Sequence, residues 1–383
     1  MAGTTLKRQL KNTGAAGVRF EVASQPDDAS IRHLLHVTPL AGRVAISLER
    51  EPSYFADAEL AGETKQTIVA YDNGKLVCVG SCAIRRRFVN GQPRRVGYLG
   101  GLRLKSQVAA GRFDIVRRGY EFFRELQAEA PADFYFTSIA ADNDRARRFL
   151  ERGVARMPIY EFVGDFTTFL ISTNRARVRG TSLSGCKIEV PATVSDQLVD
   201  FLGKFNQRLQ FQPCWSTEEL RSLERLELRA SDFHVVRKGG EMIACGALWD
   251  QRSYKQTVIR EYAPWLRMAR PIVNCFSHVI DIPRLPKVGE ILPSAFASHF
   301  ASSTGRIAEL LEMTTILARE ARERGIEFLV MGFASSDSCV AIMRRIFSCR
   351  EYQSRLYTVR WPGIGGSAAE LDNRSVAPEV ALL

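Results

Sequence analysis

The sequence predicts an α+β fold in which a mixed central β-sheet is flanked by helices, with this arrangement built twice in tandem. The chain has 383 residues, which is enough for two or three ordinary domains. Its hydrophobic content of 45% and charged content of 25% are typical of a globular protein. The third and strongest observation is that the two halves of the chain show the same order of predicted strands and helices.

The first sign of this repeat is a pair of similar β-hairpins. Residues 69–80, VAYDNGKLVCVG, alternate in polarity around an Asn-Gly turn. Residues 235–246, VVRKGGEMIACG, do the same around Gly-Gly, and both dipeptides are strong local signals of a hairpin. The turn glycines Gly74 and Gly240 correspond at an offset of 166 residues.

A second pair of similar segments follows the hairpins. Helical periodicity begins at GRF (111–113) in the first half and at GRI (305–307) in the second, an offset of 194 residues. The same offset holds for the strands predicted at 133–136 and 327–330. Because the offset grows by 28 residues, the second half carries an insertion, which lies within 251–291. These matches favour duplication of one unit. Chance similarity between strand–turn–helix segments is the alternative.

Each half is predicted to contain the same elements. A strand and a helix come first, at 20–49 and at 186–211, followed by the hairpin, a strand, a helix, a strand and a shorter helix. Terminal strands at 159–172 and 352–361 complete the two halves.

The composition between and beyond the halves sets the domain boundaries. The polar and basic run TNRARVRGTSLSG is typical of a linker, and the Gly-, Ser- and Ala-rich end of the chain predicts disorder. We therefore expect a flexible N-terminus at 1–16, a first domain at 17–173, a linker at 174–185, a second domain at 186–362 with its insertion near 251–291, and a flexible tail at 363–383.

Several classes of protein are disfavoured by simple patterns. No window approaches about 18 consecutive apolar residues, and the N-terminus has no apolar segment long enough for a signal peptide. We therefore expect a cytoplasmic protein without a membrane partner. The eight cysteines form no C-x-x-C pair and are expected to be free thiols, and the five histidines show no metal-ligand spacing, so no metal is expected.

The net charge of +11 suits an anionic partner, such as nucleic acid, acidic lipid or a phosphorylated cofactor. The charge is spread thinly and forms no long Lys/Arg tract, which argues against a dedicated nucleic-acid binder. The densest basic segment is the hairpin 84–96, IRRRFVNGQPRRV, with Arg85, Arg86, Arg87, Arg94 and Arg95. A solvated strand edge is the favoured interpretation of these arginines, and contact with an acidic substrate or phosphate is the alternative.

One junction has the composition of a phosphate-binding turn. Residues 100–113, GGLRLKSQVAAGRF, read as a strand end, a turn of small residues and a helix start. Unpaired backbone N–H groups at a helix start bind phosphate, and small side chains let the backbone approach it. An ordinary strand–helix loop without a ligand is the alternative.

The order of the elements, together with this turn, resembles the GNAT family of acyl-CoA N-acyltransferases. Residues 96–112 are similar to its central strand and loop, with Gln107, Ala110 and Arg112 in the places of the family pattern Q/R-x-x-G-x-G/A. Asn143-x-x-Ala146 followed by Arg-Gly is similar to the N-x-x-A…G segment of the family. The resemblance covers nearly all of the first half and recurs more weakly in the second.

The resemblance implies an acyl-CoA cosubstrate, expected to be acetyl-CoA, and no metal. Its pyrophosphate would lie on the turn, where Arg112 adds a positive charge. The paired glycines Gly100-Gly101 predict a bulge, or alternatively a simple bend, beside which the pantetheine arm would lie. The residues expected to bind the cosubstrate are Leu102, Arg103, Leu104, Gln107, Ala109, Ala110, Gly111, Arg112, Asn143 and Ala146.

Acyl transfer by direct attack needs a base for the amine and an acid for the leaving thiolate. The tyrosine that usually serves as the acid is replaced by Leu150, and by Arg344 in the second half. Tyr98 and Tyr160 are the substitutes that the sequence offers, and Glu161 is a possible base. For each of the three, a structural role is the alternative.

We therefore expect an N-acyltransferase that acts on an amine of a small molecule or a peptide. Three alternatives stay open. The protein could be a non-catalytic member that binds CoA or a protein partner, or an aminoacyl-tRNA-dependent transferase. The second half, here read as a degenerate copy, could instead hold the working site with His299 as the base.

Overall fold

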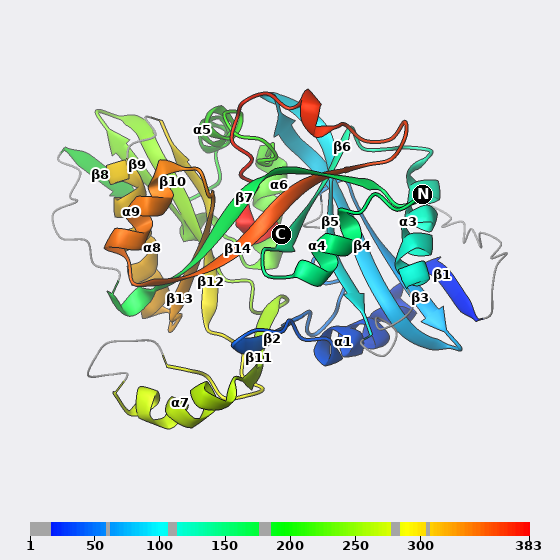
Figure 1. Ribbon diagram of the computed structural model, residues 1–383. Coiled ribbons are helices and arrows are strands. Elements are labelled where there is room, and N and C mark those ends of the chain that lie inside the picture. The colour runs from blue at the N-terminus through cyan, green and yellow to red at the C-terminus, as the bar shows by residue number, and fades with distance from the viewer. Residues whose placement is uncertain (1–16, 59–61, 106–112, 176–184, 277–283, 304–306) are drawn as a thin grey trace.

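The structure is a computed structural model, and it describes residues 17–58, 62–105, 113–175, 185–276, 284–303 and 307–383 (Figure 1). The first half of the chain contains α1 (Asp28–Val37), α3 (Phe113–Gln127), α4 (Asp144–Leu150) and the strands β1 (Val18–Val22), β2 (Val44–Glu49), β3 (Thr64–Asp72), β4 (Lys75–Val89), β5 (Gln92–Leu104), β6 (Phe134–Ala140) and β7 (Ile159–Ser172).

The second half contains α5 (Asp196–Asn206), α6 (Thr217–Ser222), α7 (Pro264–Phe276), α8 (Ile307–Glu323), α9 (Ser338–Ile346) and the strands β8 (Cys186–Glu189), β9 (Phe233–Lys238), β10 (Glu241–Trp249), β11 (Gln256–Tyr262), β12 (Ser294–Ser302), β13 (Phe328–Ala334) and β14 (Cys349–Arg360). The mixed sheet flanked by helices confirms the predicted fold class. All eight cysteines are free thiols, as expected.

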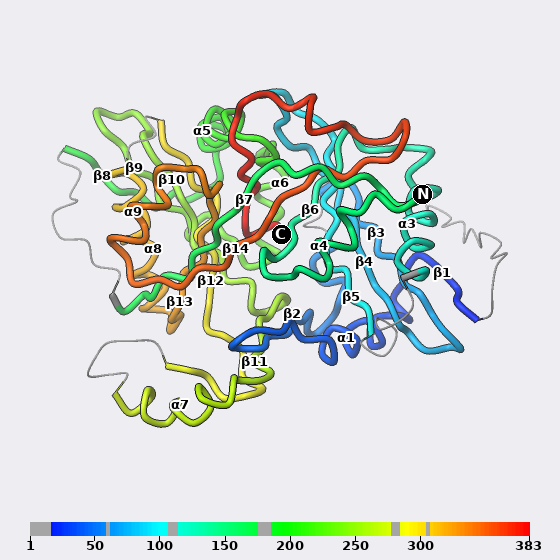
Figure 2. The backbone as a smooth tube through the Cα atoms, in the orientation of Figure 1, coloured from blue at the N-terminus to red at the C-terminus, as the bar shows by residue number. Residues whose placement is uncertain are grey.

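Twelve strands form one continuous sheet in the order β1-β3-β4-β5-β6-β14-β7-β13-β12-β10-β9-β8. Read from either edge, this order passes through equivalent elements of the two halves until it reaches the centre. There the last strands are exchanged, because β14 pairs with β6 of the first half and β7 pairs with β13 of the second. The two exchanged strands cross the middle of the molecule side by side (Figure 2). The predicted domain boundaries stay predictions, because strands cross between the two halves.

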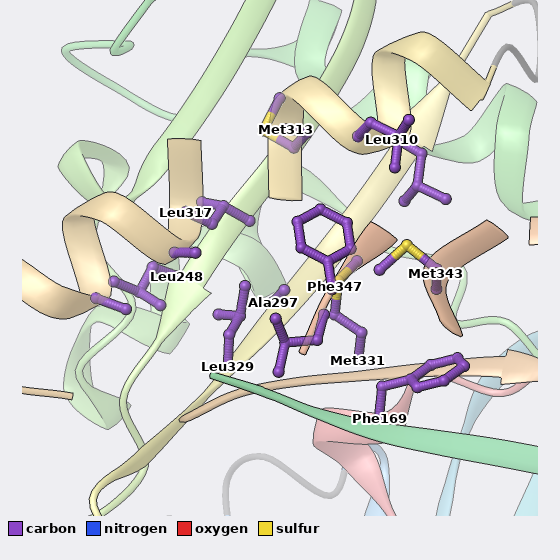
Figure 3. Close-up of a cluster of buried hydrophobic side chains, with 14 of the residues drawn as sticks. Phe169, Leu248, Ala297, Leu310, Met313, Leu317, Leu329, Met331, Met343 and Phe347 are labelled. Atoms are coloured by element: carbon purple, nitrogen blue, oxygen red, sulfur yellow. The ribbon is translucent and has the colours of Figure 1, made fainter. Parts of the chain in front are cut away.

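Helices cover both faces of this sheet. In the second half, α8 and α9 pack on one face, and Figure 3 shows how side chains of α8 such as Leu310 and Leu317 meet Leu329 and Met331 of β13. Leucines of α5 and α6 cover the other face, against Trp249. In the first half, α3 and α4 pack on one face and α1 on the other. Strands between these layers, such as β6 and β13, are therefore mostly apolar and buried.

The insertion of the second half reaches back to the first. Its strand β11 pairs antiparallel with β2 and forms a separate two-stranded sheet. The helix α7 follows β11 and lies outside the layers of the main body (Figure 1). The insertion therefore connects the two halves at a second place.

The expectation of a flexible tail is wrong. The tail at 363–383 is folded onto the molecule, with Val376, Val380 and Ala381 buried and with the Gln212 side chain donating to the Ala377 carbonyl at 2.6 Å. Its last residues are apolar, and their burial outweighs the flexibility that its glycines suggest. The N-terminus at 1–16 and most of the linker lie outside the described residues.

The arginines of the hairpin 84–96 do not all lie on a solvated edge. Arg85 and Arg87 are almost fully buried, because the segment 211–215 of the second half covers this part of β4. The Arg85 guanidinium lies 4.3 Å from the ring centre of Trp215, and Arg87 donates to the Phe211 carbonyl at 2.8 Å. The covering residues come more than 120 positions later in the chain, where a local pattern cannot reveal them.

Gly332 of β13 tests the packing of the tail. A Cβ at this position would overlap the ring of Phe166 and lie 2.9 Å from the Cβ of Val380, so we expect Gly332→Ala to lower the free energy of unfolding by about 1–3 kcal/mol. Gly203 in α5 has open space around it, and Gly203→Ala should stabilise by about 0.5–1 kcal/mol. Urea denaturation of both variants measures the difference. Equal stability of Gly332→Ala and the wild type would contradict the packing.

Candidate functional site

The two central parallel strands of the first half diverge, and we call the point of divergence the first fork. β5 and β6 pair only at Val96–Phe134, Gly97–Tyr135 and Tyr98–Phe136, although both strands continue. At the next position the hydroxyl of Thr137 donates to the carbonyl of Leu99 at 2.6 Å, so that a side chain bridges the strands. The backbone pairing of β5 with β6 therefore ends at Tyr98–Phe136.

A β-bulge lies directly beside the first fork. Gly100 is opposite Ser81 and Arg103 is opposite Val79, so that Gly101 and Leu102 together face the single residue between them on β4. Gly101 has φ +66°, a conformation that glycine adopts without steric cost. The bulge that the sequence predicted is confirmed, and the pairing of β5 with β4 resumes after it at Arg103–Val79.

The second half repeats this geometry, and we call its point of divergence the second fork. β12 and β13 pair only as far as Phe296 and Val330. A bulge on β12 follows, in which His299 takes the place that Gly101 has in the first half and has φ +53°. A histidine at positive φ is uncommon, and here the surrounding packing holds it in place.

The second fork is filled by the tail of the same chain. The carboxylate of Glu379 accepts a hydrogen bond from the backbone N–H of His299 at 3.0 Å, and the neighbouring Val380 packs against Gly332 of β13. At the start of α8 the buried carboxylate of Glu309 accepts from Ser302. Protein carboxylates therefore lie at the bulge and at the helix start of the second half.

The predicted phosphate turn of the first half lies between β5 and α3 in the chain. Gln107, Ala109, Ala110, Gly111 and Arg112 lie outside the described residues, so their assignment stays a prediction. The described chain resumes with α3, which directly follows this segment. In the first turn of α3 the position that corresponds to Glu309 is Ile115, which is buried in the core and carries no charge.

The other residues predicted to bind the cosubstrate are found in two places. Leu102, Arg103 and Leu104 lie in the bulge and end of β5, and Leu102 is exposed. Asn143 and Ala146 belong to α4, where the Asn143 side chain accepts from the backbone N–H of Ala146 at 3.1 Å and caps the helix. This cap gives the N-x-x-A spacing a structural explanation.

Of the three predicted catalytic residues, Tyr98 lies at the first fork. It belongs to the last pair before β5 and β6 diverge, and its ring packs against Gly100 and lies 5.0 Å from the ring centre of Phe136. Burial raises the pKa of Tyr98 to about 12, so the phenol keeps its proton at neutral pH. Tyr98 can therefore donate a hydrogen bond or a proton at this position.

Tyr160 is placed elsewhere. Its hydroxyl shares a hydrogen bond of 2.5 Å with Tyr120 of α3, and burial among aromatic rings raises its pKa well above the ordinary value. α3 packs on the face of β6 that presents Tyr135, whereas Tyr98 packs on Phe136 on the opposite face. Tyr98 and Tyr160 therefore lie on different faces of the sheet and cannot serve the same reacting atoms.

Glu161 of β7 accepts a hydrogen bond from the tail at 363–383. Its carboxylate accepts from the Arg360 guanidinium at 2.9 and 3.0 Å and from the backbone N–H of Ala368 at 2.8 Å. Burial alone would raise the pKa of Glu161, but these donors lower it below its ordinary value. A carboxylate stabilised in this way is a poor base, and the geometry gives Glu161 a structural role.

A polar cluster that the sequence did not reveal adjoins Tyr98. The half-buried guanidinium of Arg103 interacts electrostatically with Tyr352, with Arg50 and with Tyr98. Tyr98 interacts in turn with Arg50 and Tyr352. These residues come from three distant segments, so no spacing in the sequence could have indicated them.

Lys255 extends this cluster toward the second half. Burial, together with the nearby charge of Arg50, lowers the pKa of Lys255 to about 7, although Asp57 opposes the shift. Its ammonium donates to a backbone oxygen of Leu383 at 2.7 Å and lies 5.2 Å from the ring centre of Phe296. An amine with such a pKa exchanges protons readily at neutral pH.

His299 is not an accessible base. Its ring lies 5.0 Å from that of Trp215 and 5.8 Å from that of Trp249, and burial lowers its pKa to about 3. Nδ1 is 2.9 Å from the hydroxyl of Ser298. The geometry gives no support to a working site in the second half with His299 as its base.

Solved structures of acyltransferases have a similar architecture. Two structures of Saccharomyces cerevisiae N-myristoyltransferase with bound myristoyl-CoA are similar to this chain: one at a TM-score of 0.60 and 10% identity, covering 96% of this chain and 86% of that one, the other at 0.58 and 9%, covering 95% and 90%. A GCN5-related N-acetyltransferase from Anabaena variabilis is similar at a TM-score of 0.50 and 11% identity, covering 89% of this chain and 72% of that one.

No family model and no curated protein matches the sequence. The structural likeness is nevertheless extensive, and it defines the class of fold. The chain has the two-domain GNAT fold, as the sequence predicted. Among its solved neighbours it is similar over nearly its whole length to the N-myristoyltransferases of yeast.

The buried state of His299 has a measurable effect on stability. Its pKa of about 3 lies below the value of about 6.5 in an unfolded chain, so between these values the unfolded state binds more protons. Stability is therefore lost as the pH falls through this window. We expect this effect to amount to about 2 kcal/mol between pH 7.5 and pH 5.

The variant His299→Asn, which tolerates the positive φ, should show a shallower loss of stability than the wild type. Urea denaturation at both pH values measures the difference, and His33→Asn on the exposed side of α1 is the matched control. Burial raises the pKa of neighbouring Glu379, so protonation of this carboxyl stabilises the folded state as the pH falls, opposite to the effect of His299. The pH dependence of stability is therefore compared between the variant and the wild type, which share Glu379. An unchanged slope in His299→Asn would contradict the burial of a neutral imidazole.

Proposed function

We propose that this protein is an acyl-CoA-dependent N-acyltransferase whose acyl-CoA lies at the first fork. The observation that carries the proposal is the pair of features found together there: a parallel ladder that ends at Tyr98 and a glycine bulge on the following residues. An extended pantetheine arm can pair with strand backbone at such a place, as a peptide pairs with the edge of a sheet. The bound myristoyl-CoA of the yeast neighbours is consistent with this donor class.

The first half is proposed as the working half because the second fork is occupied by the chain itself. Glu379 caps the bulge amide there, and Glu309 places a carboxylate at the start of α8. The first half has glycine and isoleucine at the corresponding positions. The second half then acts as a wall for the acceptor.

The cluster beside Tyr98 supplies the groups that amine acylation requires. Lys255 accepts the proton of the acceptor ammonium, and the free amine attacks the thioester carbonyl. Backbone N–H groups of the bulge at Leu102 and Arg103 are the proposed donors to the oxyanion. When the C–S bond breaks, the phenol of Tyr98 gives its proton to the departing thiolate. The attacking nitrogen loses its remaining excess proton to water, and water returns a proton to Tyr98. The products are an amide and free CoA. The acceptor is proposed to be an amine of a peptide or small molecule that enters from the seam between the halves.

Binding of the donor is the first test. Acetyl-CoA or myristoyl-CoA at about 100 times its dissociation constant should stabilise the protein by about 2.7 kcal/mol, seen as a rise in Tm. Ala110→Glu places a carboxylate on the predicted phosphate turn and should abolish the rise. Thr304→Glu, at the matching position of the second half, should leave it intact. The acyl-CoA that stabilises most identifies the acyl group, and no rise with either would overturn the proposal.

Catalysis is tested separately from binding. Lys255→Arg keeps the positive charge and the donor to Leu383 but cannot accept a proton, so we expect kcat/KM to fall by about 10²–10⁴-fold and its acid limb near pH 7 to disappear. Tyr98→Phe should lower kcat without weakening acyl-CoA binding. Tyr160→Phe, on the other face of the sheet, is the matched control and should change the rate only slightly. A kcat/KM of Lys255→Arg equal to that of the wild type would exclude Lys255 as the base.

A further inference from the structure

The helix α7 of the insertion has its apolar and polar faces reversed relative to an ordinary surface helix. Its exposed side carries Trp265, Met268, Ile272 and Phe276, with exposed fractions of 60, 78, 64 and 52%. Their spacing of three and four residues places them along one stripe of the helix. Among the described residues of α7, none is buried.

Two polar side chains of α7, Arg270 and Asn274, are bonded to the backbone of the segment that follows the helix. Arg270 donates to the carbonyls of Leu285 and Pro286 at 2.9 and 3.1 Å. Asn274 exchanges two hydrogen bonds with the backbone of Leu285, at 2.8 and 3.0 Å. These bonds fix the rotation of the helix about its axis. The apolar stripe therefore faces outward because the polar side is anchored, and α7 lies outside the main body (Figure 1).

Basic residues outnumber acidic ones on α7 and the described segments joined to it, where Glu261 and Glu290 are the exposed acidic residues. Arg267 is the exposed charged residue of the helix itself, and exposed Arg43 and Lys287 lie in segments connected to it by backbone contact or sequence. α7 contains no Asp or Glu. The segment after the helix adds two more exposed apolar side chains, Val288 and Ile291. Aromatic and aliphatic side chains on one face with basic neighbours are the features of helices that lie in the interface of an anionic membrane.

We propose that α7 binds the surface of a membrane containing anionic phospholipid, with its apolar stripe inserted at the level of the headgroups. No helix in the described ranges could cross a membrane. The proposed mode is therefore peripheral. It differs from the expectation of a protein without a membrane partner, although acidic lipid is among the anionic partners that the net charge suits. Because the stripe is on the insertion, the binding is independent of the chemistry proposed at the first fork.

The test is flotation of the full chain with vesicles made of three parts phosphatidylcholine and one part phosphatidylserine. The wild type should float with these vesicles, and the fraction bound should fall as salt is raised. Met268→Glu/Ile272→Glu should lower the partition coefficient at least about tenfold, and Arg267→Ala about fivefold. Val190→Glu, an exposed apolar position far from α7 in the chain, is the matched control and should bind as the wild type does.

Fluorescence gives an independent readout. Trp265 is exposed, whereas the other three tryptophans, Trp215, Trp249 and Trp361, are buried. Binding should shift the emission to the blue and protect Trp265 from quenching by acrylamide, and Trp265→Phe should lack this change. Unchanged Tm values would show that the variants fold.

Two results would overturn the proposal. The first is a wild-type protein that stays unbound to the anionic vesicles at low salt. The second is a self-associated wild type, seen by sedimentation without lipid, that Met268→Glu/Ile272→Glu converts to monomer. In that case the stripe is a contact between copies of the chain.

Discussion

The antiparallel pairing of β7 with β14 is the interaction on which the rest of the structure depends. It runs from Cys349–Ile171 to Arg360–Ile159 and joins the last strands of the two halves at the centre of the sheet. Because each of these strands also pairs with the opposite half, neither half has a complete sheet of its own. The register is specified on both faces by buried residues such as Leu356 and Tyr357, since a slip by one residue would exchange the two faces.

This exchange also determines which segments surround each fork. The two forks lie on either side of the central pair, and the segments that surround the first fork come from both halves. The pairing of β2 with β11 brings Arg50, which follows β2, close to Lys255, which precedes β11. The polar cluster beside Tyr98 is therefore a product of assembly between the halves, and each half alone would lack either the fork or the lysine.

This origin explains which parts of the site could be predicted from the sequence. The bulge was predictable because its signal, Gly100-Gly101, is local and reflects the backbone conformation that glycine allows. The roles of Tyr160 and Glu161 were not, because their partners Tyr120 and Arg360 lie 40 and 199 residues away. The order of the elements was predictable from periodicity. The exchange of the last strands was not, because the pattern within a strand does not specify which half it pairs with.

The two forks have the same backbone geometry, and a few side chains make their surroundings different. Both have a short parallel ladder and a bulge with positive φ. In the second, an imidazole held neutral by burial fills the bulge position among three aromatic rings, and Glu379 satisfies its backbone N–H. Because that donor is already satisfied within the chain, its burial at the second fork leaves no unpaired N–H. The first fork keeps glycine at the same position, and Gly101 is exposed, so the two bulges share a backbone conformation but differ in what covers them.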